Sequence, residues 1–82
     1  MPTITIHLFA RARELAGSER IALELPEGAN VGELRSRLRL VLPACAVLLE
    51  RSAIAVNHDF ADDTKTLRGD DEVAVIPPVS GG

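Results

Sequence analysis

One long amphipathic segment in the middle of the chain constrains the fold more than any other feature. Its apolar residues recur every three or four positions and so form one stripe of a helix, at Val31, Leu34, Leu38 and Val41. Asn30 stands before the segment as a candidate N-cap, with Glu33 in capping-box register, and Pro43 ends it. A chain of 82 residues forms one domain at most. This helix is therefore expected to cover one face of a single sheet.

Strand-like segments flank the helix on both sides. Alternating apolar and polar residues predict strands over residues 3–9, 19–25, 52–57 and 72–76, with a short strand near residues 64–67. Residues 10–16 favour a short helix that ends at Gly17, and residues 46–50 stay open between a turn and the start of a strand. With the first and last strands adjacent in the middle, this order predicts an α+β fold. It is the ubiquitin-like β-grasp, a mixed sheet of about four to five strands covered by one main helix.

The composition argues against several classes of function. The formal net charge is −3, whereas a nucleic-acid-binding domain normally carries a basic face. No apolar run reaches the roughly 20 residues of a membrane span, and the N-terminus lacks a secretion signal, so a soluble cytoplasmic protein is expected. The one cysteine, Cys45, excludes an internal disulfide and is interpreted as structural or incidental. His7 and His58 stand alone, so no metal site is expected.

Acidic residues concentrate late in the chain, where only Lys65 and Arg68 offset them. The acidic residues are Asp59, Asp62, Asp63, Asp70, Asp71 and Glu72. Two interpretations stay open, a solvated acidic loop or a charged patch that steers a basic partner. On the predicted long helix, Arg35 and Arg39 share an outer face that is interpreted as solvated.

The last six residues neither extend a strand neatly nor suit a core. They read Pro77-Pro78-Val79-Ser80-Gly81-Gly82. Proline cannot donate a backbone hydrogen bond and stiffens an extended segment, whereas glycine passes where a Cβ would clash. Six extended residues reach roughly 20 Å, enough to enter a buried pocket of another protein. We therefore divide the chain into a folded domain, residues 1–76, and a flexible reactive tail, residues 77–82, that presents the Gly82 carboxylate.

Three segments resemble the small, sulfur-carrying subunit of molybdopterin synthase. Residues 9–17 (FARARELAG) are similar to that family's strand-to-helix segment, and residues 55–57 (AVN) are similar to the end of its third strand. Residues 69–82 (GDDEVAVIPPVSGG) resemble its closing strand and tail, and this is the most specific of the three motifs. Chain length and element order also agree with the family over the whole chain.

The resemblance implies a protein that carries sulfur and is not catalytic by itself. In the family, an adenylating enzyme related to ubiquitin-activating enzymes uses ATP to activate the terminal carboxylate, here that of Gly82. A sulfur donor then leaves a thiocarboxylate. The tail inserts into the large subunit of molybdopterin synthase and delivers sulfur to a pterin precursor, as a step of molybdenum cofactor biosynthesis. The carrier itself binds no cofactor, and the family precedent is a heterotetramer of two small and two large subunits.

Four apolar residues are candidates for the surface that these partners grip. Phe9 and Ile76 fall on the outer faces of the first and last strands, Ala74 is a small exposed residue, and Phe60 lies in a polar loop. None of them suits the domain's own core, so an apolar patch beside the tail is expected. The alternative is a small second core beneath the loop. The resemblance favours the patch, because the family docks both its large subunit and its adenylating enzyme through this side.

Two other functions stay open for a chain with this fold and this tail. One is sulfur carriage for thiazole synthesis or tRNA thiolation, although those carriers do not usually show the Pro-Pro-Val run before the terminal glycines. The other is a ubiquitin-like modifier conjugated to lysines through Gly82. A modifier would leave isopeptide-linked adducts, whereas a pure carrier would leave free protein with a thiocarboxylate end.

Overall fold

The computed structural model describes residues 2–78 of the chain. The elements follow the order β1 (Thr3–Leu8), α1 (Ala10–Ala16), β2 (Arg20–Glu24), α2 (Val31–Val41), a 3₁₀ turn η1 (Pro43–Cys45), α3 (Ala46–Arg51), β3 (Ala53–Val56), β4 (Asp59–Ala61) and β5 (Glu72–Ile76). In the described part of the chain, no helix is long and apolar enough to cross a membrane.

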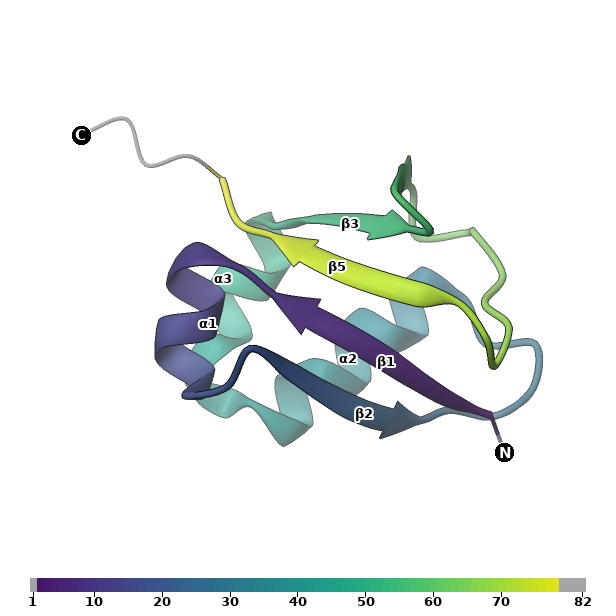
Figure 1. Ribbon diagram of the computed structural model, residues 1–82, viewed down its shortest axis with the longest axis horizontal. Coiled ribbons are helices and arrows are strands. Elements are labelled where there is room, and N and C mark those ends of the chain that lie inside the picture. The colour runs from purple at the N-terminus through teal and green to yellow at the C-terminus, as the bar shows by residue number, and fades with distance from the viewer. Residues whose placement is uncertain (1, 79–82) are drawn as a thin grey trace.

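The strands form one mixed sheet in the order β2-β1-β5-β3-β4. The central strands β1 and β5 run parallel, and every other neighbouring pair is antiparallel. Figure 1 shows α2 and α3 behind the sheet and α1 at the end where β1 and β5 finish. The prediction of a β-grasp sheet with its first and last strands in the middle is confirmed.

The core lies between the sheet and the helices. The inward residues of the two central strands are fully buried, as alternation predicts, at Ile4, Ile6, Leu8, Val73 and Val75. The α2 stripe is buried at Val31, Leu34 and Leu38, but Val41 is 51% exposed. The helix ends at Val41, and Leu42 packs against the core in its place. Residues 46–51 form the helix α3, whose Leu49 is buried. The segment that the sequence left undecided between a turn and the start of a strand is therefore a helix.

The short strand predicted near residues 64–67 is wrong. The short strand of the sheet is instead β4, at Asp59–Ala61. Thr66 makes only an isolated bridge with Asn30. The cause is the turn before β4, where Asn57 and His58 adopt positive φ angles of 50° and 72°. Two such residues form the tight connection that suits a hairpin, and neither is the glycine that usually marks it. The chain therefore turns back at once and pairs Val56 with Asp59.

Arg35 is a structural tether, so the interpretation of its side chain as solvated is wrong. The side chain is only 16% exposed and lies beside Asp63, with an N–O distance of 3.3 Å. Its guanidinium also donates to the main-chain oxygens of Leu49 and of Ser52, the latter at 2.8 Å. Arg35 thus joins α2 to the end of α3. Arg39 instead pairs with Glu50 at 2.7 Å on the partly exposed rim.

The N-cap of α2 offers a direct test of how the long helix is fixed. Asn30 Oδ1 accepts a hydrogen bond from the Glu33 main-chain N–H at 2.9 Å. We expect Asn30→Ala to lower the free energy of unfolding by about 1 kcal/mol, because one helix-terminal N–H loses its acceptor. Asn30→Ser keeps an acceptor and serves as the matched control. Urea titration followed by circular dichroism measures both, and equal stability of the two variants would contradict the capping role.

Candidate functional site

The outer face of the sheet, which the helices leave uncovered, carries a hollow of about 360 Å³. All four residues predicted for the partner patch line it: Phe9, Phe60, Ala74 and Ile76. Phe60 is 75% exposed and Phe9 is 49% exposed, so neither ring belongs to a second core. Four residues that the sequence did not assign to the patch complete the lining: His7, Ala55, His58 and Glu72.

Strand register explains why these residues meet. His7 on β1 is paired with Ala74 on β5, Ala74 with Ala55 on β3, and Ala55 with Phe60 on β4. One row thus crosses four strands, with two alanines in its middle and larger side chains at both ends. The two alanines form a shallow apolar floor, and the Phe60 ring rises beside them as a wall. A hollow of this shape can accept an apolar side chain from another protein.

Charged groups border the hollow along one side. His7 Nε2 lies 3.9 Å from Glu72 Oε2, an ion pair only when the imidazole is protonated. Both side chains remain partly exposed, so they give a polar rim to an apolar floor. Residues 2–78 contain no cluster of three His, Cys, Asp or Glu side chains that could hold a metal ion.

The segment leading to the predicted tail begins at the border of this hollow. β5 ends at Ile76, and the next residue, Pro77, is buried, so the packed part of the chain includes one residue that we assigned to the tail. Pro78 is exposed, and both prolines border a separate hollow of about 870 Å³ between α1 and α3. The remaining tail residues, Val79, Ser80, Gly81 and Gly82, lie outside the described residues.

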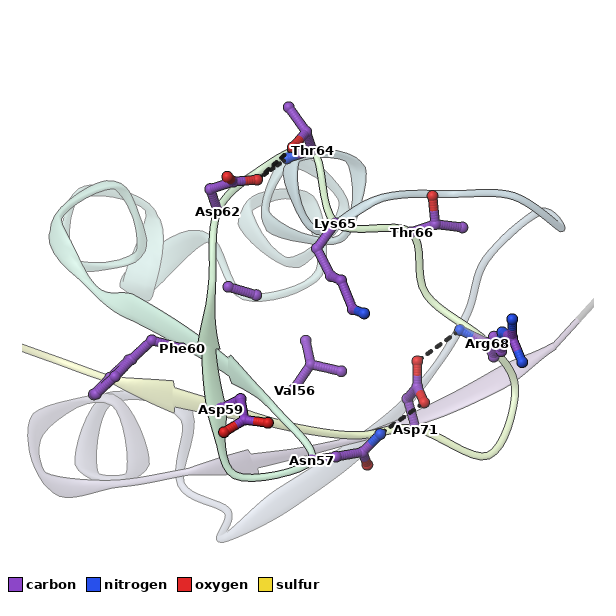
Figure 2. A pocket seen from close by; sticks show the side chains of 11 residues that line it. Val56, Asn57, Asp59, Phe60, Asp62, Thr64, Lys65, Thr66, Arg68 and Asp71 are labelled. Carbon is purple, nitrogen blue, oxygen red and sulfur yellow. Dashed lines mark hydrogen bonds between the residues drawn. The ribbon is translucent and has the colours of Figure 1, made fainter.

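A polar hollow of about 630 Å³ lies on the other side of β4, between that strand and the loop that leads to β5. Figure 2 shows the Lys65 side chain directed into it. Asp71 accepts from the Asn57 side chain at 2.9 Å and from the Arg68 main-chain N–H at 2.8 Å. Asp62 accepts from the Thr64 main-chain N–H at 2.8 Å.

These contacts assign structural roles to half of the late acidic residues. Asp62 and Asp71 hold turns, and Asp63 pairs with Arg35. Hydrogen bonds from Thr64, first from its hydroxyl and then from its main-chain N–H, hold the pKa of Asp62 below its ordinary value. The geometry therefore favours a structured acidic loop over a patch reserved for steering a partner.

Cys45 is fully buried, with Sγ 3.8 Å from the Ala12 carbonyl oxygen, so its placement supports the structural interpretation. Burial raises the pKa of the Cys45 thiol above its ordinary value of 9.0. Because the folded state favours the neutral thiol, this contribution to stability is complete below about pH 9 and is lost as the pH rises through the folded-state pKa.

Alkylation of this thiol should therefore depend on unfolding. We expect iodoacetamide at pH 8 to label Cys45 slowly in the native protein and completely in concentrated urea, as measured by intact mass. The exposed-thiol control is Ala44→Cys, whose added cysteine should react rapidly without urea, since Ala44 is exposed. Equal labelling rates of Cys45 in native and denatured protein would contradict its burial.

The chain matches the ThiS family over residues 6–82. It is 35% identical to the molybdopterin synthase sulfur carrier subunit of Arabidopsis thaliana, over 96% of this chain and 82% of that protein. It is 37% identical to the subunit of the same name from Dictyostelium discoideum, over 94% of this chain and 93% of that protein.

A solved structure shares the fold over almost the whole chain. Small archaeal modifier protein 1 of Haloferax volcanii superposes with a TM-score of 0.87 at 25% identity, covering 96% of this chain and 100% of that one. The family match, the full-length relatives and the β-grasp sheet agree with the resemblance read from residues 9–17, 55–57 and 69–82. The chain therefore belongs to the ThiS family, alongside the molybdopterin synthase sulfur carrier subunits.

Proposed function

We propose that this protein is the sulfur carrier of molybdopterin synthesis and that Gly82 is its working residue. The observation that carries the proposal is the similarity, over 94–96% of this chain, to relatives named molybdopterin synthase sulfur carrier subunit, with a family match that includes Gly81 and Gly82. In this proposal the described residues contribute the outer-face hollow as the surface for partners, and other proteins perform the chemistry.

The proposed cycle requires activation of the terminal carboxylate, because a free carboxylate is a poor electrophile. The Gly82 carboxylate attacks the α-phosphate of ATP in the adenylating enzyme, pyrophosphate leaves, and an acyl-adenylate forms. A donor of sulfide-level sulfur then attacks the acyl carbon, AMP leaves, and the product is a thiocarboxylate, a soft nucleophile that is anionic at neutral pH. The thiocarboxylate sulfur bonds to a carbon of the pterin precursor, and water then cleaves the acyl–sulfur bond, which leaves one sulfur on the pterin and returns Gly82 as a carboxylate.

The large subunit of the synthase is the proposed acceptor of the tail. We place its docking surface on the outer-face hollow, because Ile76 borders this hollow and directly precedes the tail. A partner that covers Phe9 and Phe60 is then positioned to receive residues 79–82 in its own pocket. Glycines at positions 81 and 82 suit a narrow channel, since neither carries a Cβ. Two carriers on a dimer of large subunits would form the proposed heterotetramer.

Intact mass spectrometry of the protein purified from its native cell tests the proposal. We expect a fraction of the molecules to carry one sulfur in place of one terminal oxygen. Deleting Gly81-Gly82 should abolish that species and molybdoenzyme activity while the circular dichroism spectrum stays unchanged. Normal molybdoenzyme activity in the deletion strain would refute the proposal.

A second candidate is a protein modifier attached to lysines through Gly82, favoured by the likeness to small archaeal modifier protein 1. The same acyl-adenylate could be attacked by a lysine amine, which forms an isopeptide bond and releases AMP. The two functions separate in the same cell extract. Higher-mass adducts that disappear with the Gly81-Gly82 deletion would support modification, and a thiocarboxylate without adducts would support carriage alone.

A further inference from the structure

The strand β2 presents an open hydrogen-bonding edge. Among residues 2–78 it ends the sheet on the side opposite β4 and pairs with β1 alone, and Figure 1 shows it at the lower edge of the sheet. In an antiparallel pair, alternate residues direct their N–H and C=O groups toward the neighbouring strand. The Leu8 N–H donates to the Glu19 oxygen, and the Leu25 N–H donates to the Pro2 oxygen, so the odd-numbered residues of this segment face β1.

The even-numbered residues therefore turn their main-chain groups to the open side. They are Arg20, Ala22 and Glu24, and all three are exposed. The Ser18 hydroxyl donates to the Arg20 carbonyl oxygen at 2.9 Å, in agreement with that direction. A carbonyl oxygen has two lone pairs, so this contact leaves Arg20 able to accept a second hydrogen bond.

The charges on this edge are complementary to themselves. Read in the opposite direction, the order basic, small, acidic becomes acidic, small, basic. An antiparallel second copy centred on Ala22 thus places Arg20 opposite Glu24 at both ends. Opposite charges directly across a strand pair are stabilising, and like charges are destabilising. A pair centred on Arg20 or on Glu24 would set like charges face to face. A pair centred on Ile21 or on Leu23 would place a charged residue opposite Ala22, without an ion pair. The charge pattern therefore favours the register centred on Ala22.

We propose that β2 pairs with β2 of a second copy of this chain about a twofold axis at Ala22, joining two sheets into one. The three outward-facing residues of each copy form the ladder, and Pro26 limits its length because it has no N–H. On the core side, Ile21 is only half-buried in the single chain. In the pair it lies opposite Leu23 of the second copy, which covers it.

This pairing is independent of the proposed function. β2 and β4 are at opposite edges of the sheet, so the outer-face hollow beside Phe60 stays open in the pair. Two short strands bury far less than the roughly 1,200 Å² of a stable interface, so the dimer is weak and populated at high protein concentration. The test therefore uses a covalent trap.

The trap is Ala22→Cys in the full-length chain. In the proposed register the two introduced cysteines form a hydrogen-bonded pair with their Cα atoms about 5.5 Å apart, which suits a disulfide. The native Cys45 is buried and does not compete. Under a mild oxidant, we expect Ala22→Cys to form dimers at least roughly ten times faster than Ala44→Cys, an exposed alanine outside the sheet. Non-reducing electrophoresis measures both rates.

Charge reversal then separates the proposed pairing from random collision. In the Ala22→Cys background, Arg20→Glu or Glu24→Arg places like charges opposite each other and should slow cross-linking. The double variant Arg20→Glu/Glu24→Arg restores complementarity and should recover the original rate. All four side chains involved in a pair are on the exposed edge, and circular dichroism checks that each variant is folded. Equal rates for Ala22→Cys and Ala44→Cys, or no recovery in the double variant, would overturn the proposal.

Discussion

Replacing Phe60 with alanine is expected to weaken binding of the large synthase subunit by at least about 2 kcal/mol, or roughly 30-fold in Kd. The ring is 75% exposed and forms one wall of the outer-face hollow. A partner that covers this hollow removes the ring from water, and large aromatic side chains in such positions supply much of the binding energy. Isothermal titration calorimetry with the large subunit of the same organism measures the loss.

The matched control is Leu40→Ala. Leu40 is 78% exposed, so it is as apolar and as accessible as Phe60, but it lies on α2, on the opposite side of the sheet. We expect its replacement to leave the Kd within about twofold and both variants to keep their stability within about 0.5 kcal/mol. Equal losses of affinity for the two variants would show that the outer face has no special role.

Much of this surface could be predicted because alternation along a strand assigns each residue to a face. Ile4, Ile6 and Leu8 take the inner face of β1, which leaves His7 outward, and the same reasoning places Ala74 outward on β5. What alternation does not contain is the register between strands. His7 and Ala55 join the hollow only because β1, β5 and β3 align them with Ala74. Their participation therefore could not be read from the local pattern.

Phe60 shows a different limit of the sequence argument. Its inclusion in the patch followed from the mismatch between a large ring and its polar neighbours. Its position on a strand did not follow, because the turn at Asn57 and His58 lacks the usual glycine. The main-chain geometry of those two residues brings Phe60 opposite Ala55. A three-residue strand also gives too few alternating positions for its period to be recognised.

The role of Arg35 was hidden for a related reason. On the α2 pattern it occupies a position beside the apolar stripe, where arginine is usually solvated. Its acceptors, the Leu49 and Ser52 carbonyl oxygens, come from the end of α3, 14 and 17 residues later in the chain. The helix α3 is short, and no sequence pattern near it predicts that its terminal carbonyl groups face α2. Only the packed structure brings donor and acceptors together.

Removing this tether is expected to give the largest loss of stability among the surface-accessible substitutions. Arg35→Ala removes the side-chain donor of the Ser52 carbonyl oxygen and one of the two donors of the Leu49 carbonyl oxygen, which keeps the Ser52 N–H at 3.4 Å. A partly buried group left unsatisfied costs about 1–3 kcal/mol, and the packing of the arginine stem between α2 and α3 is lost as well. We expect the free energy of unfolding to fall by about 2–3 kcal/mol in total, with a decrease in Tm of at least about 8 °C. A domain of this size has little stability to spare, since small proteins unfold at a cost of about 5–15 kcal/mol.

Urea unfolding followed by far-ultraviolet circular dichroism suits this measurement, because the chain has no tryptophan or tyrosine for fluorescence. Arg37→Ala is the matched control, since Arg37 lies on the same helix and is exposed, and its loss should change stability by less than about 0.5 kcal/mol. Arg35→Lys keeps the charge but lacks the planar fork that reaches several acceptors, so an intermediate loss is expected. If Arg35→Ala proved as stable as Arg37→Ala, apolar packing alone would hold α2 against α3. The hydrogen bonds of the guanidinium would then contribute nothing measurable to the free energy of unfolding.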